Sequence, residues 1–400
     1  MRRALWVIDS MNSKISRLKV AHIVQDEKFP DSAFDLFERC APSISDFYLP
    51  DKRRPIKHLK KIRPIRVSKF SFLNPFFTRK LAQYDAVILH GLTSFNIELV
   101  ARSKKSVPFV WIGMGFDYYD LLCENADKLI KPKTALLIDA AGCQYSEKKI
   151  KVLLRKLLKK VVYAHASKKI EIVSRITLFA PVLESEYLFM KEAYPDETPE
   201  YIDWNYAATA PLIEGNSHLL GCKGTNILIG NSATPTNNHI DTFDIVKGVM
   251  DIGDAHLFVP LSYGDKNYRE VVKTVGMEMF GGRFHPIIDF MNYSDYMNMV
   301  SSCSVVIMNH KRQQAGANIA AALFMGARVF LDPDNGFYRD YMYSGVKIHD
   351  LSDLVKDPSL AYRPLTAHEK EKNRDILRKM RGWDALYEKT ENLLVRISEL

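Results

Sequence analysis

Short apolar runs alternate with segments of helical periodicity along the whole chain. In the first half the strand-like runs lie at 19–25, 44–50, 86–91, 108–115 and 175–181. After residue 220 the alternation starts again, with runs at 226–232, 256–264, 283–290, 304–310 and 327–333. Strands that alternate with helices form parallel sheets whose two faces are covered by helices. The pattern therefore predicts an α/β fold with two doubly wound, Rossmann-like domains.

The segment 210–224 is rich in glycine and turn residues and is expected to separate the two domains. We place an N-terminal domain at 1–215 and a C-terminal domain at 216–365. A final helical stretch, 366–400, has no obvious place in the second sheet and can pack back across the boundary. Two such domains enclose a cleft lined by the carboxyl ends of their strands, where ligands of this fold class bind. The loops at those ends are therefore expected to carry the chemistry.

One of these loops, Gly230-Asn231-Ser232, follows the apolar run at 226–229 and precedes a predicted helix. Glycine allows the backbone to turn sharply and to approach a ligand closely. Residues 236–238 are expected to cap the helix, whose N-terminus favours a bound phosphate. The loop is a candidate anion site, although an ordinary strand–loop–helix connection has the same pattern.

A second loop follows the run at 304–310 and leads into an alanine-rich helix that begins near Gly316. Arg312 can neutralise a diphosphate bidentately, and the amides of Gln313 and Gln314 can reach sugar or base hydroxyls. Small residues around Gly316 let a ligand lie close to the helix N-terminus. We expect this loop and the loop at 230–232 to converge on one site, the alternative being a surface loop with a closely packed helix behind it.

Two strand ends in the first half offer a general base for a hydroxyl nucleophile. Asp117 follows the strand that ends near Gly113 and is the first choice, and His90 at the end of the preceding strand is the second. The structural alternatives are a helix cap for Asp117 and a buried imidazole for His90. Residues 113–119 match the GxGxxG fingerprint only in part, since the third glycine is missing, which disfavours nicotinamide binding.

The composition adds limits to this picture. The chain has 400 residues, 47% of them hydrophobic and 26% charged, as expected of a soluble globular protein with about two domains. No apolar run reaches 18 residues, which argues against a transmembrane span. The five cysteines are widely spaced and form no CxxC pair, so we expect reduced cytosolic thiols and neither a zinc site nor disulfides.

The net charge of +9 is concentrated in the first half, where residues 1–220 hold 35 Lys and Arg against 25 Asp and Glu. Residues 51–85 contain eleven basic residues between their terminal aspartates, interleaved with Phe70, Phe72, Phe76 and Phe77. Residues 147–171 combine nine more basic residues with an apolar stripe of helical spacing. Such segments can lie on an anionic membrane, and the alternative is a solvated basic face. Nucleic acid is a less favoured partner, because none of the usual binding motifs is present.

Several segments resemble, in the same order, those of the TDP-N-acetylfucosamine:lipid-linked disaccharide transferases of enterobacterial common antigen. They are HG at 90–91, WIGMGFDYY at 111–119, ILIGNSATPTNNHI at 227–240, VPLSYGDKNY at 259–268 and RQQAGAN at 312–318. The resemblance covers roughly residues 19–350. It implies a GT-B fold, a TDP-linked deoxy-amino sugar held by the C-terminal domain, an undecaprenyl-diphosphate-linked glycan acceptor, and neither metal nor cofactor. It also implies a peripheral protein on the cytoplasmic face of the bacterial inner membrane.

The resulting hypothesis is a peripheral membrane glycosyltransferase of polysaccharide assembly in which Asp117 or His90 deprotonates the acceptor. The candidate donor-binding residues are Gly230, Asn231, Ser232, Tyr263, Arg312, Gln313, Gln314, Gly316 and Asn318. The rival hypothesis is a non-catalytic nucleotide-sugar-binding or scaffold protein of the same pathway.

Overall fold

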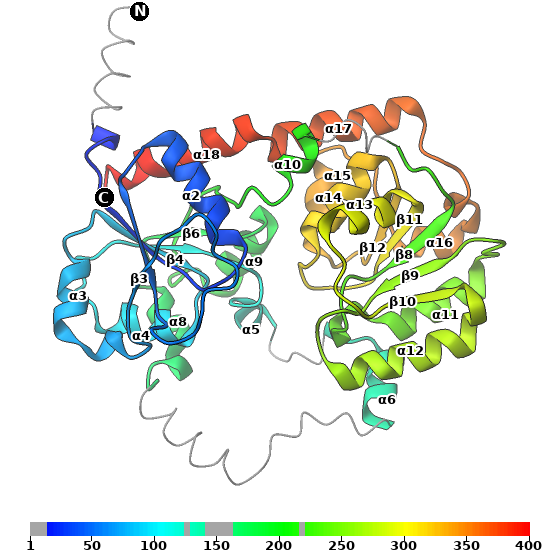
Figure 1. Ribbon diagram of the computed structural model, residues 1–400, viewed down its shortest axis with the longest axis horizontal. Coiled ribbons are helices and arrows are strands. Elements are labelled where there is room, and N and C mark those ends of the chain that lie inside the picture. Colours follow the sequence, from blue (N-terminus) through cyan, green and yellow to red (C-terminus); the bar gives the residue numbers. More distant parts are fainter. Residues whose placement is uncertain (1–13, 124–128, 141–162, 216–220) are drawn as a thin grey trace, which may run out of the picture. The chain divides into compact units, whose positions relative to one another are not determined.

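The computed structural model describes residues 14–123, 129–140, 163–215 and 221–400. The chain divides into two compact units, each built around one parallel sheet (Figure 1). The first unit comprises residues 1–122, 148–208 and 383–400, and the second comprises 123–147 and 209–382. The predicted α/β fold with two doubly wound parallel-sheet domains is confirmed.

The first sheet has seven strands in the order β3-β2-β1-β4-β5-β6-β7. Their bounds are β1 Val20–Ile23, β2 Ser45–Leu49, β3 Ile65–Arg66, β4 Ala86–His90, β5 Phe109–Ile112, β6 Leu178–Ala180 and β7 Glu200–Tyr201. All pairs are parallel, and β1 lies between β2 and β4, with Val20 opposite both Ser45 and Ala86. Because the chain runs outward from β1 to β3 and then returns to β4 on the other side of β1, the strand order reverses between β1 and β4. Ligands of open α/β sheets bind at such a switch point.

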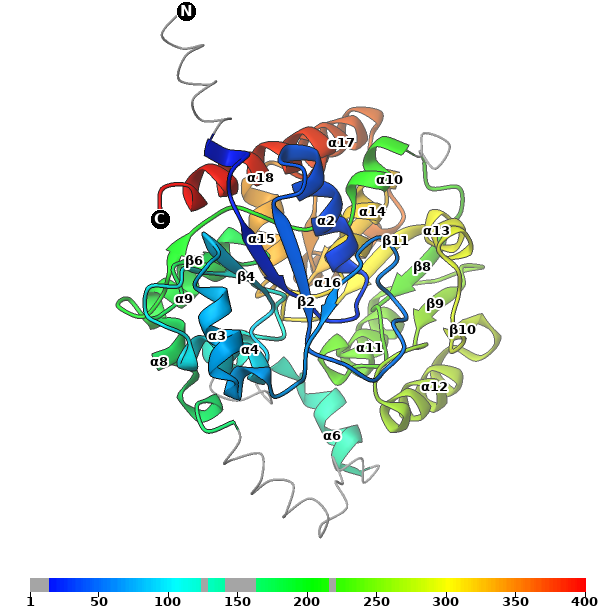
Figure 2. The same cartoon turned by 60° about the vertical axis from the view of Figure 1, so that its left-hand side comes forward.

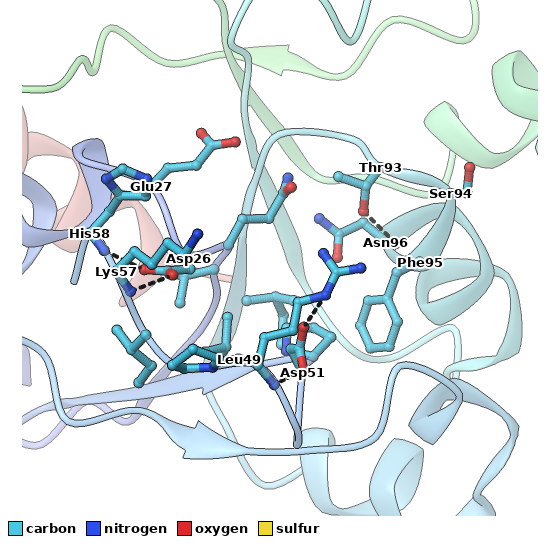
Figure 3. A pocket seen from close by; sticks show the side chains of 17 residues that line it. Asp26, Glu27, Leu49, Asp51, Lys57, His58, Thr93, Ser94, Phe95 and Asn96 are labelled. Carbon is cyan, nitrogen blue, oxygen red and sulfur yellow. Dashed lines mark hydrogen bonds and ion pairs between the residues drawn. The ribbon is translucent and has the colours of Figure 1, made fainter. Parts of the chain in front are cut away.

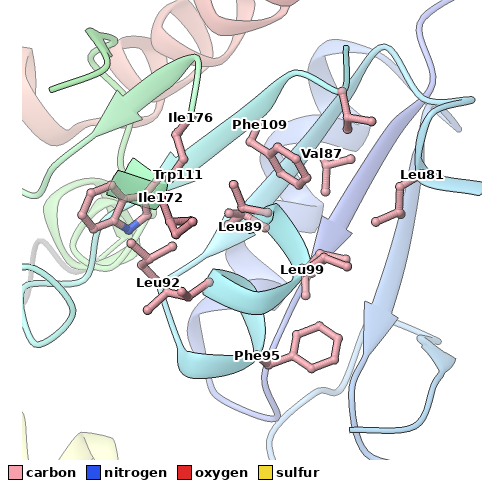
Figure 4. Close-up of a cluster of buried hydrophobic side chains, with 14 of the residues drawn as sticks. Leu81, Val87, Leu89, Leu92, Phe95, Leu99, Phe109, Trp111, Ile172 and Ile176 are labelled. Atoms are coloured by element: carbon pink, nitrogen blue, oxygen red, sulfur yellow. The ribbon is translucent and has the colours of Figure 1, made fainter. Parts of the chain in front are cut away.

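Helices cover both faces of the first sheet (Figure 1). On one face α2 (Phe29–Cys40) packs against α18 (Trp383–Ile397), although the two are far apart in sequence. On the other face lie η1 (Ser71–Leu73), α3 (Pro75–Leu81), α4 (Ser94–Arg102), η3 (Ala166–Lys168) and α8 (Lys169–Val173), while α5 (Tyr119–Leu122) contacts α9 (Glu184–Ala193). Strand residues such as Leu89, Phe109 and Trp111 pack against Leu99 and Ile172 of these helices to form a buried core (Figure 4).

The second sheet has six parallel strands in the order β10-β9-β8-β11-β12-β13. Their bounds are β8 Asn226–Ile229, β9 Leu257–Pro260, β10 Phe284–Ile287, β11 Cys303–Met308, β12 Arg328–Leu331 and β13 His349–Asp350. The same argument places the switch point of this sheet between β8 and β11. The two sequence motifs at 230–232 and 312–318 follow these two strands, which explains why they belong to one edge of the sheet.

Two groups of helices pack on the second sheet (Figure 2). One group is centred on α14 (Gly316–Met325), which contacts α10 (Ala210–Gly215), α13 (Tyr293–Ser301) and α17 (Ala367–Arg381). The other is centred on α11 (His239–Val249), which contacts α6 (Pro132–Ala140), α12 (Lys266–Phe280) and α16 (Leu351–Lys356). The remaining elements are η5 (Pro235–Asn237), η6 (Gly281–Arg283), α15 (Gly336–Tyr343) and η7 (Pro358–Ala361).

Each of the ten predicted strand runs overlaps a strand, whereas the two-residue edge strands β3, β7 and β13 are not predicted. Most of the basic amphipathic helix predicted at 147–171 lies outside the described residues. Among the four described ranges, no helix is both long and apolar enough to span a bilayer. The cysteines in those ranges, Cys40, Cys123, Cys222 and Cys303, are free thiols, and Cys143 lies outside them.

Candidate functional site

The loops after β8 and β11 meet in one hydrogen-bonded network. Gln314 Nε2 donates to Asn231 Oδ1 at 3.3 Å, and Asn231 Nδ2 donates to the Tyr263 hydroxyl at 2.9 Å. Gln314 Oε1 in turn accepts from Thr236 Oγ1 at 3.0 Å and from Arg312 Nη2 at 3.3 Å. The structure therefore brings together four of the predicted donor-binding residues at the switch point of the second sheet.

The loop after β8 is shaped by the residues packed beneath it. Gly230 has a φ of +67°, and a Cβ there would lie 2.7 Å from His239 Nε2, so only glycine fits. The Asn237 side chain accepts from Asn231 N at 3.1 Å and donates to the Ser232 carbonyl at 3.0 Å. Asn237 thus fixes the loop, and Ser232, only 2% exposed, is held inside it.

The N-terminus of α11 differs from the sequence prediction. Asn238 takes the N-cap position in the left-handed conformation, with φ at 53°, and its side chain makes no capping hydrogen bond. Its amide instead donates to the Asn309 carbonyl and accepts from Lys131 N, both at 2.8 Å. Since the next residue, His239, is fully buried, protein groups already cover this helix start. The capping role predicted for residues 236–238 is therefore wrong, because their side chains bond to neighbouring loops.

In contrast to the N-terminus of α11, the N-terminus of α14 is open, since the other groups of the described residues do not cover it completely. Ala315 precedes it with φ at 59° and provides no side-chain cap. The N–H groups of the first helical turn have no intrahelical acceptors and carry the positive end of the helix dipole. Asn318 lies half-buried in this turn, and Gln313 lies half-buried just before Gln314. A Cβ at Gly316 would come within 2.3 Å of the Phe337 ring, so this glycine allows the close packing of α15 rather than the approach of a ligand.

Several buried polar atoms around these loops have no hydrogen-bond partner among the described residues. They are His239 Nε2, both amide atoms of Asn309, His310 Nε2 and Arg312 Nε. His239, Asn309 and His310 are at most 1% exposed, and burial lowers the pKa of both histidines to about 3, so they are neutral at pH 7. Buried polar groups are normally paired. Because these atoms are buried, they remain unpaired polar groups inside this edge of the sheet and do not face solvent.

In the first unit, Asp117 joins the loops that follow β4 and β5. Its Oδ2 accepts from Leu92 N and from Trp111 Nε1, both at 2.7 Å, and its Oδ1 accepts from Met114 N at 2.8 Å. The residue is 3% exposed. Burial raises the pKa of this carboxyl group, and the three hydrogen-bond donors act in the opposite direction. Both carboxylate oxygens are thus occupied by protein donors.

His90 lies inside a chain of buried polar side chains. Its Nδ1 is 2.7 Å from the Tyr206 hydroxyl, and its Nε2 is 3.0 Å from His22 Nδ1. His22 Nε2 continues the chain to Ser45 Oγ at 3.2 Å. His90 is 2% exposed, and burial lowers its pKa to about 3. It is a neutral imidazole with both nitrogens engaged.

A cavity of about 590 Å³ opens at the switch point of the first sheet, between the ends of β1, β2 and β4 (Figure 3). Its lining includes residues 23–27 after β1, residues 49–51 and 54–58 after β2, and residues 93–96 at the start of α4. Sequence reasoning does not predict this cavity, although Asp26 and Glu27 stand directly after the first strand. Applying the strand-end rule to that strand as well would have identified them.

Within the part of the chain that the structure describes, no group of three or more His, Cys, Asp or Glu side chains is arranged to hold a metal ion. In the partial glycine fingerprint, a Cβ at Gly113 would lie 2.6 Å from the Tyr118 ring and 2.9 Å from the Phe179 ring. This glycine therefore serves aromatic packing.

Comparison with known proteins agrees with this architecture. Residues 211–363 match the model of the family described as 4-alpha-L-fucosyltransferase, glycosyl transferase group 56. The fold is similar to that of Anabaena HepE solved with UDP and glucose, with a TM-score of 0.61 and 11% identity over 94% of this chain and 99% of that one. It is also similar to sucrose-phosphate synthase from Thermosynechococcus elongatus, with a TM-score of 0.61 and 12% identity over 95% and 99%.

A glycosyltransferase from Rickettsia africae gives a TM-score of 0.59 and 12% identity over 95% of this chain and 98% of that one. At such identities the structural likeness establishes the fold, which is the GT-B fold expected from the sequence. The loops after β8 and β11 both lie within the segment that matches the family. This match and the shared fold together support that the protein is a glycosyltransferase.

Proposed function

We propose that this glycosyltransferase moves an N-acetylfucosamine-like deoxy-amino sugar from a TDP-linked donor to an undecaprenyl-diphosphate-linked glycan in bacterial surface polysaccharide synthesis. The observation that carries the proposal is the hydrogen-bonded pair of loops at the β8–β11 switch point, beside the open N-terminus of α14. Nucleotide binding by HepE, whose structure contains UDP and glucose, supports a nucleotide-sugar donor. The sequence resemblance supports the TDP-linked amino sugar and the lipid-linked acceptor.

The donor-binding role follows from the chemistry of the loop pair. Arg312 is half-buried. Its Nη2 donates to Gln314, whereas its Nη1 has no partner among the described residues and keeps N–H donors for a diphosphate. The N–H groups at the start of α14 supply the positive end of a helix dipole for the same anion. Both features stabilise the charge that develops on the diphosphate as it leaves. Asn231 and Tyr263 present amide and phenol groups to the rest of the donor.

The remaining residues of the proposed donor site position this network. Gly230 and Ser232 shape the loop that presents Asn231, Gly316 lets α14 begin against Phe337, and the side chains of Gln313 and Asn318 flank Arg312 and the helix start.

Membrane association is supported by the surface of residues 51–85. Of the four phenylalanines there, Phe72 and Phe77 are buried, whereas Phe70 is 42% exposed and Phe76 is 78% exposed. Ile65 and Leu73 are also exposed, and basic residues surround them without an acidic residue between 52 and 84. Apolar side chains inserted among basic ones are typical of proteins that bind anionic lipid surfaces. We therefore propose a peripheral protein of the inner membrane, and the sequence resemblance supports its cytoplasmic face.

The test combines ligand binding with turnover. The purified protein should gain thermal stability in TDP, because a bound ligand stabilises the native state by mass action. It should also transfer sugar from TDP-N-acetylfucosamine to a lipid-linked disaccharide. Arg312→Ala should reduce turnover by about 10²- to 10³-fold, the usual loss for one group that stabilises transition-state charge.

Arg283→Ala is the matched control, because Arg283 precedes β10 at the amino edge of the same sheet. It should retain activity and TDP binding. Turnover by Arg312→Ala at the control's rate would remove Arg312 from the diphosphate site. Tight TDP binding by the wild-type protein with neither transfer nor donor hydrolysis would favour the non-catalytic binding protein instead.

A further inference from the structure

We propose that the cavity at the β1–β4 switch point binds the acceptor glycan and that Glu27 accepts the proton of the attacking hydroxyl. This inference rests on the proposed transfer reaction and assigns its second substrate and its base. The cavity of about 590 Å³ belongs entirely to the first unit. Its size lies within the range of about 300–1,000 Å³ that is common for small-molecule sites.

Acceptors and donors without a partner among the described residues both line this cavity: the Glu27 carboxylate is an acceptor, and the Lys57 ammonium and the Ser94 hydroxyl are donors. Glu27 is half-buried, and its carboxylate has no hydrogen-bond or ion-pair partner among the described residues; Figure 3 draws it without a contact to the other lining side chains. Asn96 is 2% exposed; its Nδ2 donates to the Gly91 carbonyl, and its buried Oδ1 has no partner among those residues. Free donors and a free carboxylate together match a ligand whose hydroxyls both donate and accept hydrogen bonds, as those of a sugar do.

The other carboxylates near the cavity are already engaged. Asp26 accepts from the backbone N–H groups of Lys57, His58 and Leu59 and so holds the loop after β2. Asp51 accepts from the backbone N–H groups of the next loop residues and lies 3.7 Å from the Arg54 guanidinium. Neither can accept a proton without losing bonds that shape the cavity wall.

The two bases expected from the sequence lie deeper in the same unit. Asp117 has both oxygens occupied, and His90 has both nitrogens occupied. Electrostatic interactions connect Glu27 to Asp117 and to Tyr206, and Tyr206 is the phenol that bonds His90. We therefore assign Asp117 and His90 to positioning the loops behind the cavity, and Glu27 to contact with the acceptor.

The charges around Glu27 suit a base. Burial raises the pKa of this carboxyl group, the nearby Asp117 raises it further, and His58 on the loop after β2 acts in the opposite direction. A carboxylate with a raised pKa is a stronger general base. As the acceptor oxygen forms its bond to the anomeric carbon, the bond from that carbon to the diphosphate oxygen breaks and TDP leaves with the electron pair. The hydroxyl proton passes to the Glu27 carboxylate, which balances the step.

The experiment compares Glu27→Gln with Glu192→Gln. Both substitutions remove one carboxylate from the first unit, and Glu192 is an exposed residue of α9. With TDP-N-acetylfucosamine and an undecaprenyl-diphosphate-linked disaccharide, Glu27→Gln should lose about 10²- to 10⁴-fold in kcat, as expected for loss of a general base. Its TDP-induced rise in melting temperature should equal that of the wild-type protein. Glu192→Gln should behave as wild type in both measurements.

The pH profile separates a base from a residue with a structural role. In the wild-type protein, kcat/KM should fall as the pH falls through the raised pKa of Glu27, and this acidic limb should disappear in Glu27→Gln. Wild-type turnover by Glu27→Gln, or a slower variant that keeps the acidic limb, would overturn the assignment. Those outcomes would leave the proposed transfer reaction intact, whereas a wild-type protein that binds TDP but transfers no sugar would contradict both.

Discussion

The side chain of Gln314 donates a hydrogen bond to Asn231 Oδ1 across 3.3 Å, although the two residues are 83 positions apart in the sequence. Gln314 follows β11 and Asn231 follows β8, so the bond joins the two loops at the switch point of the second sheet. Neither residue is free to move alone, because Asn231 also bonds Tyr263 and Gln314 also bonds Thr236. We expect donor binding to depend on the pair as a unit.

A double-mutant cycle checks this dependence. Asn231→Ala and Gln314→Ala should each weaken binding of TDP-N-acetylfucosamine by about tenfold, the effect of losing a hydrogen bond of about 1.4 kcal/mol. The double variant should lose less than the sum, with a coupling energy of about 1 kcal/mol measured by calorimetric titration. Asn226 and Ser302 form a comparable side-chain bond of 3.1 Å near the amino ends of β8 and β11 and serve as the control pair. Strictly additive losses for Asn231 and Gln314 would contradict a shared role.

Asp117→Asn should destabilise the first unit. An asparagine keeps one oxygen but places an N–H₂ group against one or two of the donors from Leu92, Trp111 and Met114. Buried unsatisfied donors cost about 1–3 kcal/mol each, so the free energy of unfolding should fall by about 2–4 kcal/mol in urea titrations. Asp196→Asn, at an exposed carboxylate of the same unit, is the control and should change it by less than about 0.5 kcal/mol. Unchanged stability for Asp117→Asn would show that the buried carboxylate does not hold the two loops.

The sequence pattern was sufficient to predict the architecture, because buried parallel strands are continuous apolar runs of a recognisable length. It could not reveal β3, β7 and β13, whose two-residue strands carry polar residues such as Arg66, Glu200 and Asp350 and exist only through pairing with a neighbour. The convergence of the loops at 230–232 and 312–318 follows from strand order, so it was predictable once the fold class was known.

The side-chain environment of each site residue was not predictable in this way. Asp117 stands at a strand end, as a base would, but its three donors come from the loop after β4, from β5 itself and from the loop after β5, and the sequence pattern does not show that these meet. His90 gains its two partners from β1 and from residue 206. The sequence does not predict a role for Glu27, because the polar stretch after the first strand contains neither a glycine nor a recognisable motif. Its free carboxylate becomes evident only when the engagement of its neighbours is known.

Phe76→Ser should weaken association with anionic vesicles. Phe76 is 78% exposed in α3, beside Arg79 and Lys80. Loss of a phenyl group from the lipid interface costs about 1.5–3 kcal/mol if the ring is fully inserted, or roughly 10- to 150-fold in partitioning. Co-sedimentation with phosphatidylglycerol vesicles measures it. Phe290→Ser removes an equally exposed ring, at 82%, from the second unit and should have no effect. Equal losses for both variants would argue against a membrane-binding surface at residues 51–85.

Acidification should destabilise the second unit through its buried histidines. The folded-state pKa of His239 and of His310 is lowered to about 3 by burial, whereas an unfolded histidine titrates near about 6.5. The stability that each neutral imidazole contributes is therefore fully present above about pH 6.5 and is lost as the pH falls toward 3, because only the unfolded chain takes up the proton. Each group should reduce the free energy of unfolding by about 1.4 kcal/mol per pH unit below that point. Urea titrations at pH 7.5 and 5.5 measure the loss of stability between these pH values, of which one such histidine accounts for about 1.4 kcal/mol. His239→Gln should reduce the loss by about this amount, and His368→Gln, at an exposed residue of α17, should leave it unchanged. An unaltered loss in His239→Gln would mean that the His239 imidazole is protonated in the folded protein, which its burial and its closeness to His310 make energetically unfavourable.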